Sequence, residues 1–206
     1  MIGYYNYTVI LTYVGTIFGF VGITYTFNNN FKLALICLMI SGFCDMFDGK
    51  IASTMKRSKQ EKRFGIQIDS LSDLICFGVL PSLLVLRLTK GELIYVAITI
   101  MYLLCALVRL AWFNVDEEER QEQEECGRDA YLGLPVTTSA LILPLIVGSV
   151  GLLKLPVDRI VPWVLLFVAV AFISPFKLKK PKIVGKIIML LLGIAGFTVV
   201  FLGGQI

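Results

Sequence analysis

Four long runs of this sequence contain no Asp, Glu, Lys or Arg. They cover residues 1–31, 130–153, 160–176 and 187–206. A helix needs about 20 apolar residues to cross the roughly 30 Å hydrocarbon core of a bilayer, and these runs approach or exceed that length. Over the whole chain 57% of the residues are hydrophobic and 17% are charged, whereas soluble domains carry about 25% charge. The pattern favours a membrane protein over a soluble all-α bundle.

Three further segments, residues 33–52, 66–86 and 93–114, have the length of a membrane span but are interrupted by a few charges. With the four uncharged runs they predict about seven transmembrane helices. We find no internal repeat and no soluble domain. The predicted fold is therefore an all-α, polytopic membrane helical bundle that forms a single integral-membrane domain over residues 1–206.

The distribution of basic residues predicts the orientation of this bundle. Of the 19 Lys and Arg residues, 13 lie in the loops at residues 50–63, 120–128 and 177–186. Loops rich in Lys and Arg face the cytoplasm, so we expect these three loops and the N-terminus to be cytoplasmic in a multi-pass protein of the cell membrane. The net charge of +4 then reflects topology and contact with anionic lipid headgroups. We expect no nucleic-acid partner.

Cysteine and histidine usage limits the chemistry. The chain has five cysteines and no histidine. Four of the cysteines fall inside predicted spans and Cys126 lies in a cytoplasmic loop, so a disulfide framework is not expected. Without histidine or a C-x2-C pair, a zinc site is not expected either. Proton transfer near neutral pH would depend on carboxylates, lysines, tyrosines or thiols.

Four carboxylates lie within segments that otherwise have the composition of membrane spans. Asp45 and Asp48 are three residues apart, and Asp69 and Asp73 are four apart, so each pair projects from one face of its own helix. If the loop runs from about residue 53 to 65, the pairs lie at matching depths of about 6 to 12 Å below the cytoplasmic ends of two antiparallel helices. Acidic residues in a membrane span are costly and indicate a functional site.

Four carboxylates in one pocket would repel one another unless a cation lay between them. Oxygen ligands without histidine or thiolate suit Mg²⁺ or Mn²⁺, and two such ions would bind a diphosphate and polarise its phosphorus. The alternatives are ion pairs with Lys50 or Arg109, or a path for protons or cations. Small residues beside the aspartates, namely Gly49, Ala52 and Gly65, leave room for a nucleotide, although helix packing is a competing explanation.

Two other segments are predicted to be structural. Residues 115–129 contain eight acidic residues and two arginines, and they favour a solvated loop with short helical extensions of the flanking spans. Residues 177–186, with Pro175 and Pro181 nearby, favour a cytoplasmic elbow between the last two spans.

The order of seven residues resembles the signature of the CDP-alcohol phosphatidyltransferases, D-x2-D-G-x2-A-R-x8-G-x3-D-x3-D: Asp45, Asp48, Gly49, Ala52, Gly65, Asp69 and Asp73. The resemblance implies a six-helix family core followed here by a C-terminal helix, and a homodimer. It also implies that the four aspartates bind the metal ions and that Asp73 is the general base. Gly49, Ala52 and Gly65 would shape the pocket for the cytidine diphosphate.

The sequence departs from this signature at two places. Ser53 replaces the family's arginine, and 11 residues separate Ser53 from Gly65 where 8 are common. The longer loop should leave the helices unchanged. We expect Arg57 or Lys56 to supply the missing positive charge, so that the CDP group contacts a set of seven residues: Asp45, Asp48, Gly49, Ala52, Ser53, Arg57 and Gly65.

Residues 68–81, 109–114 and 133–135 are similar to the phosphatidylserine synthase branch of this family, with a weaker similarity at residues 174–181. The resemblance implies transfer of a phosphatidyl group from CDP-diacylglycerol to L-serine. An arginine can grip a carboxylate through two parallel hydrogen bonds, so Arg109 is the candidate that binds serine, with Asn114 as a second; snorkelling and helix capping are the alternatives. Glycerol phosphate or inositol as acceptor, or a cation transporter, remain competing functions.

Overall fold

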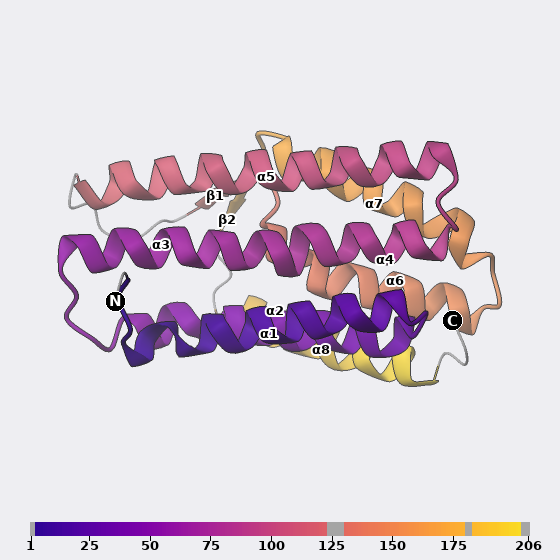
Figure 1. The fold of residues 1–206 in the computed structure, drawn as a ribbon, viewed down its shortest axis with the longest axis horizontal. Helices are drawn as coiled ribbons and strands as arrows, with labels where there is room; N and C mark the ends of the chain where they lie inside the picture. Colours follow the sequence, from indigo (N-terminus) through magenta and orange to yellow (C-terminus); the bar gives the residue numbers. More distant parts are fainter. Residues whose placement is uncertain (1–2, 123–129, 180–182, 203–206) are drawn as a thin grey trace.

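The structure describes residues 3–122, 130–179 and 183–202, and in these ranges the computed structural model contains seven long helices that run back and forth along one axis (Figure 1). One of the seven consists of two α-helices joined without a break by a π-helical segment. The bounds are α1 (Ile10–Phe27), α2 (Phe31–Ala52), α3 (Lys59–Asp73) continuing through the π-helical segment (Leu74–Val79) into α4 (Leu80–Leu88), α5 (Leu93–Glu122), α6 (Ser139–Leu152), α7 (Val157–Ile173) and α8 (Ile183–Leu202). The predicted all-α helical bundle is confirmed.

Apolar side chains cover much of the outside of this bundle. By length and composition, Tyr7–Phe27, Lys59–Leu88 and Leu93–Arg120 could each cross a membrane. On the outer surface Phe167 of α7 is 76% exposed and Leu104 of α5 is 53% exposed. Large apolar surfaces of this kind are not stable in water, which identifies the chain as a membrane protein.

The helices pack most extensively in the pairs α1 with α2, α5 with α7 and α6 with α8. Small residues let α1 approach its neighbours closely. A Cβ atom on Gly19 would lie 2.5 Å from the Cys76 sulfur, and one on Gly22 would lie 2.9 Å from Leu80 Cδ2. Between the pairs lies a core that contains the fully buried rings of Tyr102, Phe77 and Phe172.

The helix that carries Asp69 and Asp73 begins earlier than predicted. We expected the loop to extend to residue 65, but α3 begins at Lys59, so the hairpin loop contains only residues 53–58 and Gly65 lies inside the helix. The reason is a capping box: the Ser58 side chain accepts from the Glu61 backbone N–H, and the Glu61 carboxylate accepts from the Ser58 N–H. These paired hydrogen bonds satisfy two backbone donors at the start of a helix.

Two short strands were not predicted: one lies at the start of the predicted span 130–153, where α6 begins only at Ser139, and the other lies in the predicted elbow at residues 177–186. Strand β1 (Ala130–Leu132) pairs antiparallel with β2 (Lys177–Lys179), with Tyr131 opposite Leu178. The predicted elbow at residues 177–186 therefore begins with a strand, and residues 180–182 lie outside the described residues. The predicted acidic loop is helical as far as Glu122, because α5 continues without a break, and residues 123–129 lie outside the described residues.

Candidate functional site

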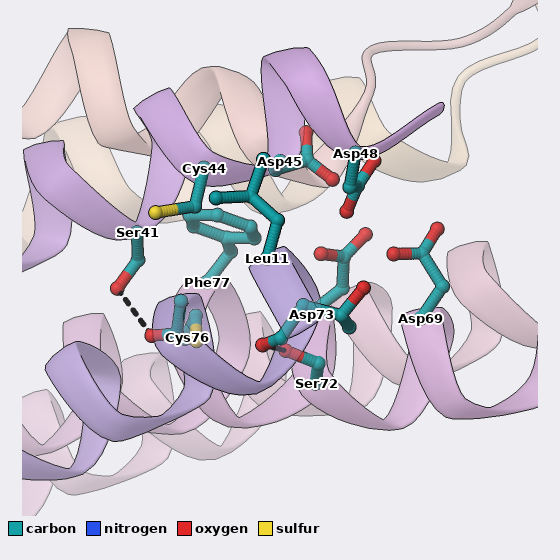
Figure 2. Close-up of a pocket in the computed structure, with 12 residues that line it drawn as sticks. Leu11, Ser41, Cys44, Asp45, Asp48, Asp69, Ser72, Asp73, Cys76 and Phe77 are labelled. Atoms are coloured by element: carbon teal, nitrogen blue, oxygen red, sulfur yellow. Dashed lines mark hydrogen bonds between the residues drawn. The ribbon is translucent and has the colours of Figure 1, made fainter. Parts of the chain in front are cut away.

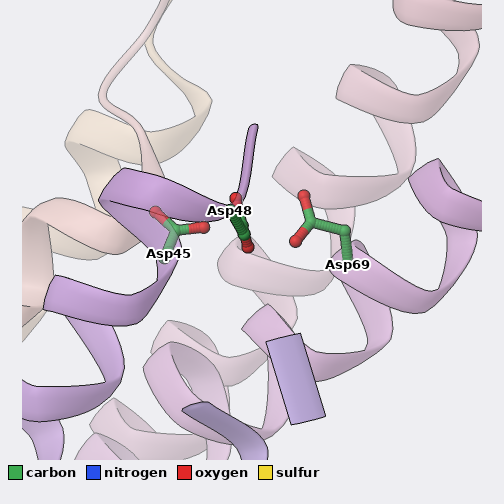
Figure 3. A group of neighbouring side chains, drawn as sticks. All are labelled: Asp45, Asp48 and Asp69. Atoms are coloured by element: carbon green, nitrogen blue, oxygen red, sulfur yellow. The ribbon is translucent and has the colours of Figure 1, made fainter. Parts of the chain in front are cut away.

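The hairpin of α2 and α3 brings three of the four predicted carboxylates together. One carboxylate oxygen from each of Asp45, Asp48 and Asp69 lies within 4.8 Å of the other two (Figure 3). The first two side chains project from the last turns of α2 and the third projects toward them from α3. The predicted convergence of carboxylates from two neighbouring helices is therefore what the structure contains.

Asp73 lies one helical turn beyond Asp69 and faces the same space. All four aspartates line one pocket, with the α2 pair opposite the α3 pair (Figure 2). Asp73 is not part of the three-carboxylate group, although it lines the pocket with them. We call this space the aspartate pocket; its empty volume of about 190 Å³ includes space that is open to solvent. A larger ligand would have to extend beyond it.

Helix α1 and several small polar residues complete the walls of the aspartate pocket, and the sequence analysis did not identify them. They are Leu11, Thr12 and Gly15 of α1, Ser41 and Cys44 of α2, and Ser72, Cys76 and Phe77 from α3 and the segment after it. Spacing could have found those beside the aspartates, because Ser41 precedes Asp45 by four residues and Cys76 follows Asp73 by three. On α1 the spacing of Gly15, Gly19 and Gly22 is typical of a close helix-packing face and could have indicated which side of the helix contacts them.

Hydrogen bonds join the three helices at the inner end of the pocket. The hydroxyls of Thr16 and Ser72 lie 2.6 Å apart. The Ser41 hydroxyl donates to the Gly15 carbonyl at 2.9 Å, and the Cys76 thiol donates to the same carbonyl at 3.4 Å. Because α1, α2 and α3 are each tied to a neighbour, the carboxylates are held on a rigid support, which is what a binding site requires.

The chain changes from α-helical to π-helical directly after Asp73. The π-helical segment Leu74–Val79 leaves a backbone carbonyl of Phe77 that accepts from the buried Tyr102 hydroxyl at 2.7 Å. The Ser82 hydroxyl donates to the Gly78 carbonyl at 2.8 Å. Single π-helical turns inside α-helices occur frequently at functional sites. Here the π-helical segment begins directly after Asp73, so the regular α-helical spacing that places Asp69 and Asp73 on one face stops there.

The positions proposed for the nucleotide lie around the mouth of the pocket. A Cβ on Gly49 would have no neighbour within 4 Å among the described residues, so this glycine does not serve close helix packing. A Cβ on Gly65 would lie 3.1 Å from Arg57 Nη1. Arg57 therefore reaches from the hairpin loop across α3, one turn before Asp69, whereas the Ser53 hydroxyl donates to the Lys50 carbonyl at 2.7 Å. Ala52 is the last residue of α2.

The two candidate acceptor residues lie on α5. Arg109 is buried, and its Nε donates to the Leu134 carbonyl at 3.2 Å; it is not among the residues that line the aspartate pocket. Leu134 follows Gly133, which has a φ of +71° and whose N–H donates to the Phe176 carbonyl at 2.7 Å. Arg109 therefore supports the turn that connects β1 to α6.

Asn114 connects two helices. Its side-chain oxygen accepts from the Ser70 hydroxyl of α3, and its Nδ2 donates to Gln67 Oε1 at 3.2 Å. The sequence analysis considered Asn114 a possible helix cap, but α5 continues to Glu122, so Asn114 is inside the helix. Its two contacts lie on the turns of α3 that flank Asp69.

The donor set fits a hard divalent cation. Asp45, Asp48 and Asp69 offer only carboxylate oxygens, at separations that one ion or two adjacent ions can bridge. None of the described residues that line the pocket is a lysine or arginine, so the negative charge is not balanced by an internal ion pair. Mg²⁺ and Mn²⁺ prefer such oxygen ligands.

Comparison of the sequence with known proteins identifies a family that includes this region of the chain. The sequence profile of the family described as "CDP-alcohol phosphatidyltransferase" matches residues 5–174. No solved structure matches the chain significantly.

Several characterised proteins are similar to it, and each is named CDP-diacylglycerol--serine O-phosphatidyltransferase. The Saccharomyces cerevisiae protein is 36% identical over 51% of this chain and 38% of its own length. The Bacillus subtilis protein is 25% identical over 75% of this chain and 89% of its own length. The Helicobacter pylori protein is 28% identical over 63% of this chain and 52% of its own length. The chain thus matches about half or less of the length of the Saccharomyces and Helicobacter proteins, but most of the length of the Bacillus protein.

Proposed function

The chain belongs to the CDP-alcohol phosphatidyltransferase family, and we propose that it transfers the phosphatidyl group of CDP-diacylglycerol to L-serine, forming phosphatidylserine and CMP. One observation carries the proposal: the carboxylates of Asp45, Asp48 and Asp69 converge from two helices within 4.8 Å in a chain of this family. The names of the similar proteins from three organisms support serine as the acceptor.

Asp45, Asp48 and Asp69 are the residues that would hold Mg²⁺ or Mn²⁺, in the form of two ions, with Asp73 as a further ligand. Bound divalent ions supply positive charge that stabilises the diphosphate and the departing CMP. The aspartates come from rigid helices tied together by Ser41, Ser72 and Thr16, so little reorganisation is needed when the charges are neutralised.

Asp73 is the proposed general base. It lies in the pocket beside the three-carboxylate group, where it can accept the proton of the serine hydroxyl while the hydroxyl oxygen attacks the phosphorus of the phosphatidyl group. A new P–O bond to serine forms, the P–O bond to CMP breaks, and CMP leaves with its oxygen charged. Proton transfer to a positioned side chain typically contributes about 10²- to 10⁴-fold to a rate.

The CDP group of the substrate would bind at the mouth of the pocket. Its diphosphate would contact Asp45 and Asp48 through the metal ions, and the open space beside Gly49 would admit the nucleotide. Ala52 and Ser53 border this space at the end of α2. Arg57, positioned over Gly65, is the residue that would supply the positive charge absent at position 53, with Lys56 as the neighbouring cation.

We propose serine rather than a phosphorylated acceptor because of the residues that line the pocket. Glycerol phosphate would bring a second phosphate, yet the described residues lining the pocket include no lysine or arginine. Arg109 is proposed to bind the serine carboxylate, and Asn114 to assist. Both lie on α5, which packs against α3, and Asn114 contacts residues on either side of Asp69. Arg109 would have to extend from the Leu134 carbonyl toward the pocket. We further propose that the protein is multi-pass with the aspartates toward the cytoplasm, as the Lys- and Arg-rich loops indicate, and that it assembles as a homodimer.

One assay tests the acceptor and the competing functions together. The purified protein is incubated with CDP-diacylglycerol, Mg²⁺ or Mn²⁺, and either serine, inositol or glycerol phosphate, and the release of CMP is measured. We expect release with serine alone and none after EDTA treatment. Release with another acceptor only would refute serine as the acceptor, and no release with any acceptor would refute the transferase function.

A further inference from the structure

Residues 3–9, which precede α1, cross the loop that joins α2 to α3. Two tyrosines of this segment make contacts with residues about 50 positions away. Tyr7 Oη lies 3.0 Å from Thr54 Oγ1, and Tyr4 Oη donates to Gln60 Oε1 at 2.8 Å. The Tyr4 ring also packs edge-on against Phe64, with the ring centres 5.6 Å apart. We call residues 3–9 the strap.

The direction of the Tyr7 hydrogen bond follows from its neighbour. The Thr54 hydroxyl donates its single proton to the Ile51 carbonyl at 2.7 Å, so its oxygen accepts from Tyr7. The result is a chain of two hydrogen bonds from the strap to the last turn of α2. The final carbonyls of a helix lack partners within the helix, so this chain fixes the end of the helix on which Asp45 and Asp48 lie.

Tyr4 fixes the other side of the hairpin loop. Gln60 and Phe64 both belong to the first turns of α3, and Phe64 immediately precedes Gly65. The strap therefore contacts the loop at Thr54, where α2 has just ended, and again at the start of α3. Between these two contacts lies Arg57, whose guanidinium lies over Gly65.

We propose that Tyr4 and Tyr7 are positioning residues that hold the hairpin loop, residues 53–58, in the arrangement that binds the nucleotide diphosphate. This inference rests on the proposed function for the identity of the ligand. The tyrosines do not line the aspartate pocket, and they act through Thr54, Gln60 and Phe64, which flank the loop that carries Arg57. The loop of six residues loses conformational freedom on binding a diphosphate, and a loop already held in place loses less, so affinity increases.

The test measures binding of CDP in the presence of Mg²⁺, together with hydrogen exchange of the loop amides, in purified full-length protein. Tyr7→Phe removes one hydrogen bond, typically worth about 0.5 to 1.5 kcal/mol, so we expect the Kd for CDP to rise about 2- to 10-fold. Exchange at residues 53–58 should become faster. The kcat at saturating CDP-diacylglycerol and the KM for serine should stay within about twofold of wild type.

Two further variants distinguish positioning from general destabilisation. Thr54→Val breaks the same hydrogen bond, so the double variant with Tyr7→Phe should bind CDP no more weakly than Thr54→Val alone. Tyr95→Phe makes the same chemical change at the opposite end of the bundle, where the hydroxyl has no hydrogen-bond partner among the described residues, and should leave binding unchanged.

The outcomes separate this inference from the proposed function. Unchanged loop exchange in the combined Tyr4→Phe and Tyr7→Phe variant, or unchanged CDP affinity despite faster exchange, would overturn the positioning role. Suppose that the wild-type protein binds CDP, that the variants bind it more weakly, and that no CMP is released from CDP-diacylglycerol. The positioning role of the strap would then be supported and the transferase function refuted. If wild type bound no CDP, both would fail.

Discussion

Replacing Arg57 by alanine tests how the chain supplies positive charge to its substrate. Arg57 lies in the hairpin loop and its Nη1 atom is 3.1 Å from the Cβ position of Gly65. Four residues, or about 6 Å along the helix, separate Gly65 from Asp69. A hydrogen bond to a charged group contributes about 1.5 to 3 kcal/mol, so its loss should weaken CDP-diacylglycerol binding by about 10- to 150-fold.

Steady-state kinetics of CMP release in mixed micelles measures this effect. With Arg57→Ala we expect the KM for CDP-diacylglycerol to rise while the KM for serine stays unchanged. Arg57→Lys should recover part of the loss, because lysine keeps the charge but not the planar fork of N–H donors. Arg87→Ala is the matched control, because Arg87 is an exposed arginine at the other end of the bundle.

An unchanged KM for CDP-diacylglycerol in the combined Arg57→Ala and Lys56→Ala variant would refute the reasoning. The charge absent at Ser53 would then have no replacement in the hairpin loop. A fall in kcat with no change in KM would also contradict it, because Arg57 would then act on the transition state and not on nucleotide binding.

Three further predictions concern the base, the packing and the helix cap. Asp73→Asn should abolish CMP release yet leave CDP binding within about threefold of wild type in equilibrium dialysis, because the other three carboxylates remain; substantial residual turnover would exclude Asp73 as the base. Gly148→Ala would place a Cβ 2.7 Å from Val199 Cγ1 and 2.9 Å from the Val199 backbone, so thermal unfolding in detergent should show a loss of about 1 to 3 kcal/mol. Ser58→Ala removes the cap of α3 and should cost about 1 kcal/mol, with faster amide exchange over the first turn; unchanged exchange would show that the cap contributes little.

The spans and the aspartate cluster could be predicted because each depends on spacing along one helix or across one hairpin. Long uncharged runs indicate membrane helices wherever they occur, and spacings of three and four residues place carboxylates on one face. The start of α3 was also available in the sequence, since Ser58 and Glu61 form the S-x-x-E pattern of a capping box. The basic residues around them led to the prediction of a longer loop.

Other features depend on contacts between distant segments. The burial of Arg109 beneath the Leu134 carbonyl, the bridge from Asn114 to Ser70 and Gln67, and the pairing of β1 with β2 require knowing which helices are neighbours. No local pattern specifies them. The strap is another example, because nothing near Tyr7 in the sequence indicates Thr54 as its partner.

The role proposed for Arg57 connects the two departures from the family signature. Extra residues between Ser53 and Gly65 lie before Gly65 in the chain, so they cannot alter the spacing of Gly65, Asp69 and Asp73 on α3. They lie in the hairpin loop, residues 53–58, or in the turns of α3 before Gly65, and Arg57 in this loop reaches back to Gly65. A loop loses conformational entropy when it orders, and the positioning role proposed for the strap would reduce that cost. Under the role proposed for Arg57, deleting residues of the loop should weaken CDP-diacylglycerol binding unless a cation is restored at position 53.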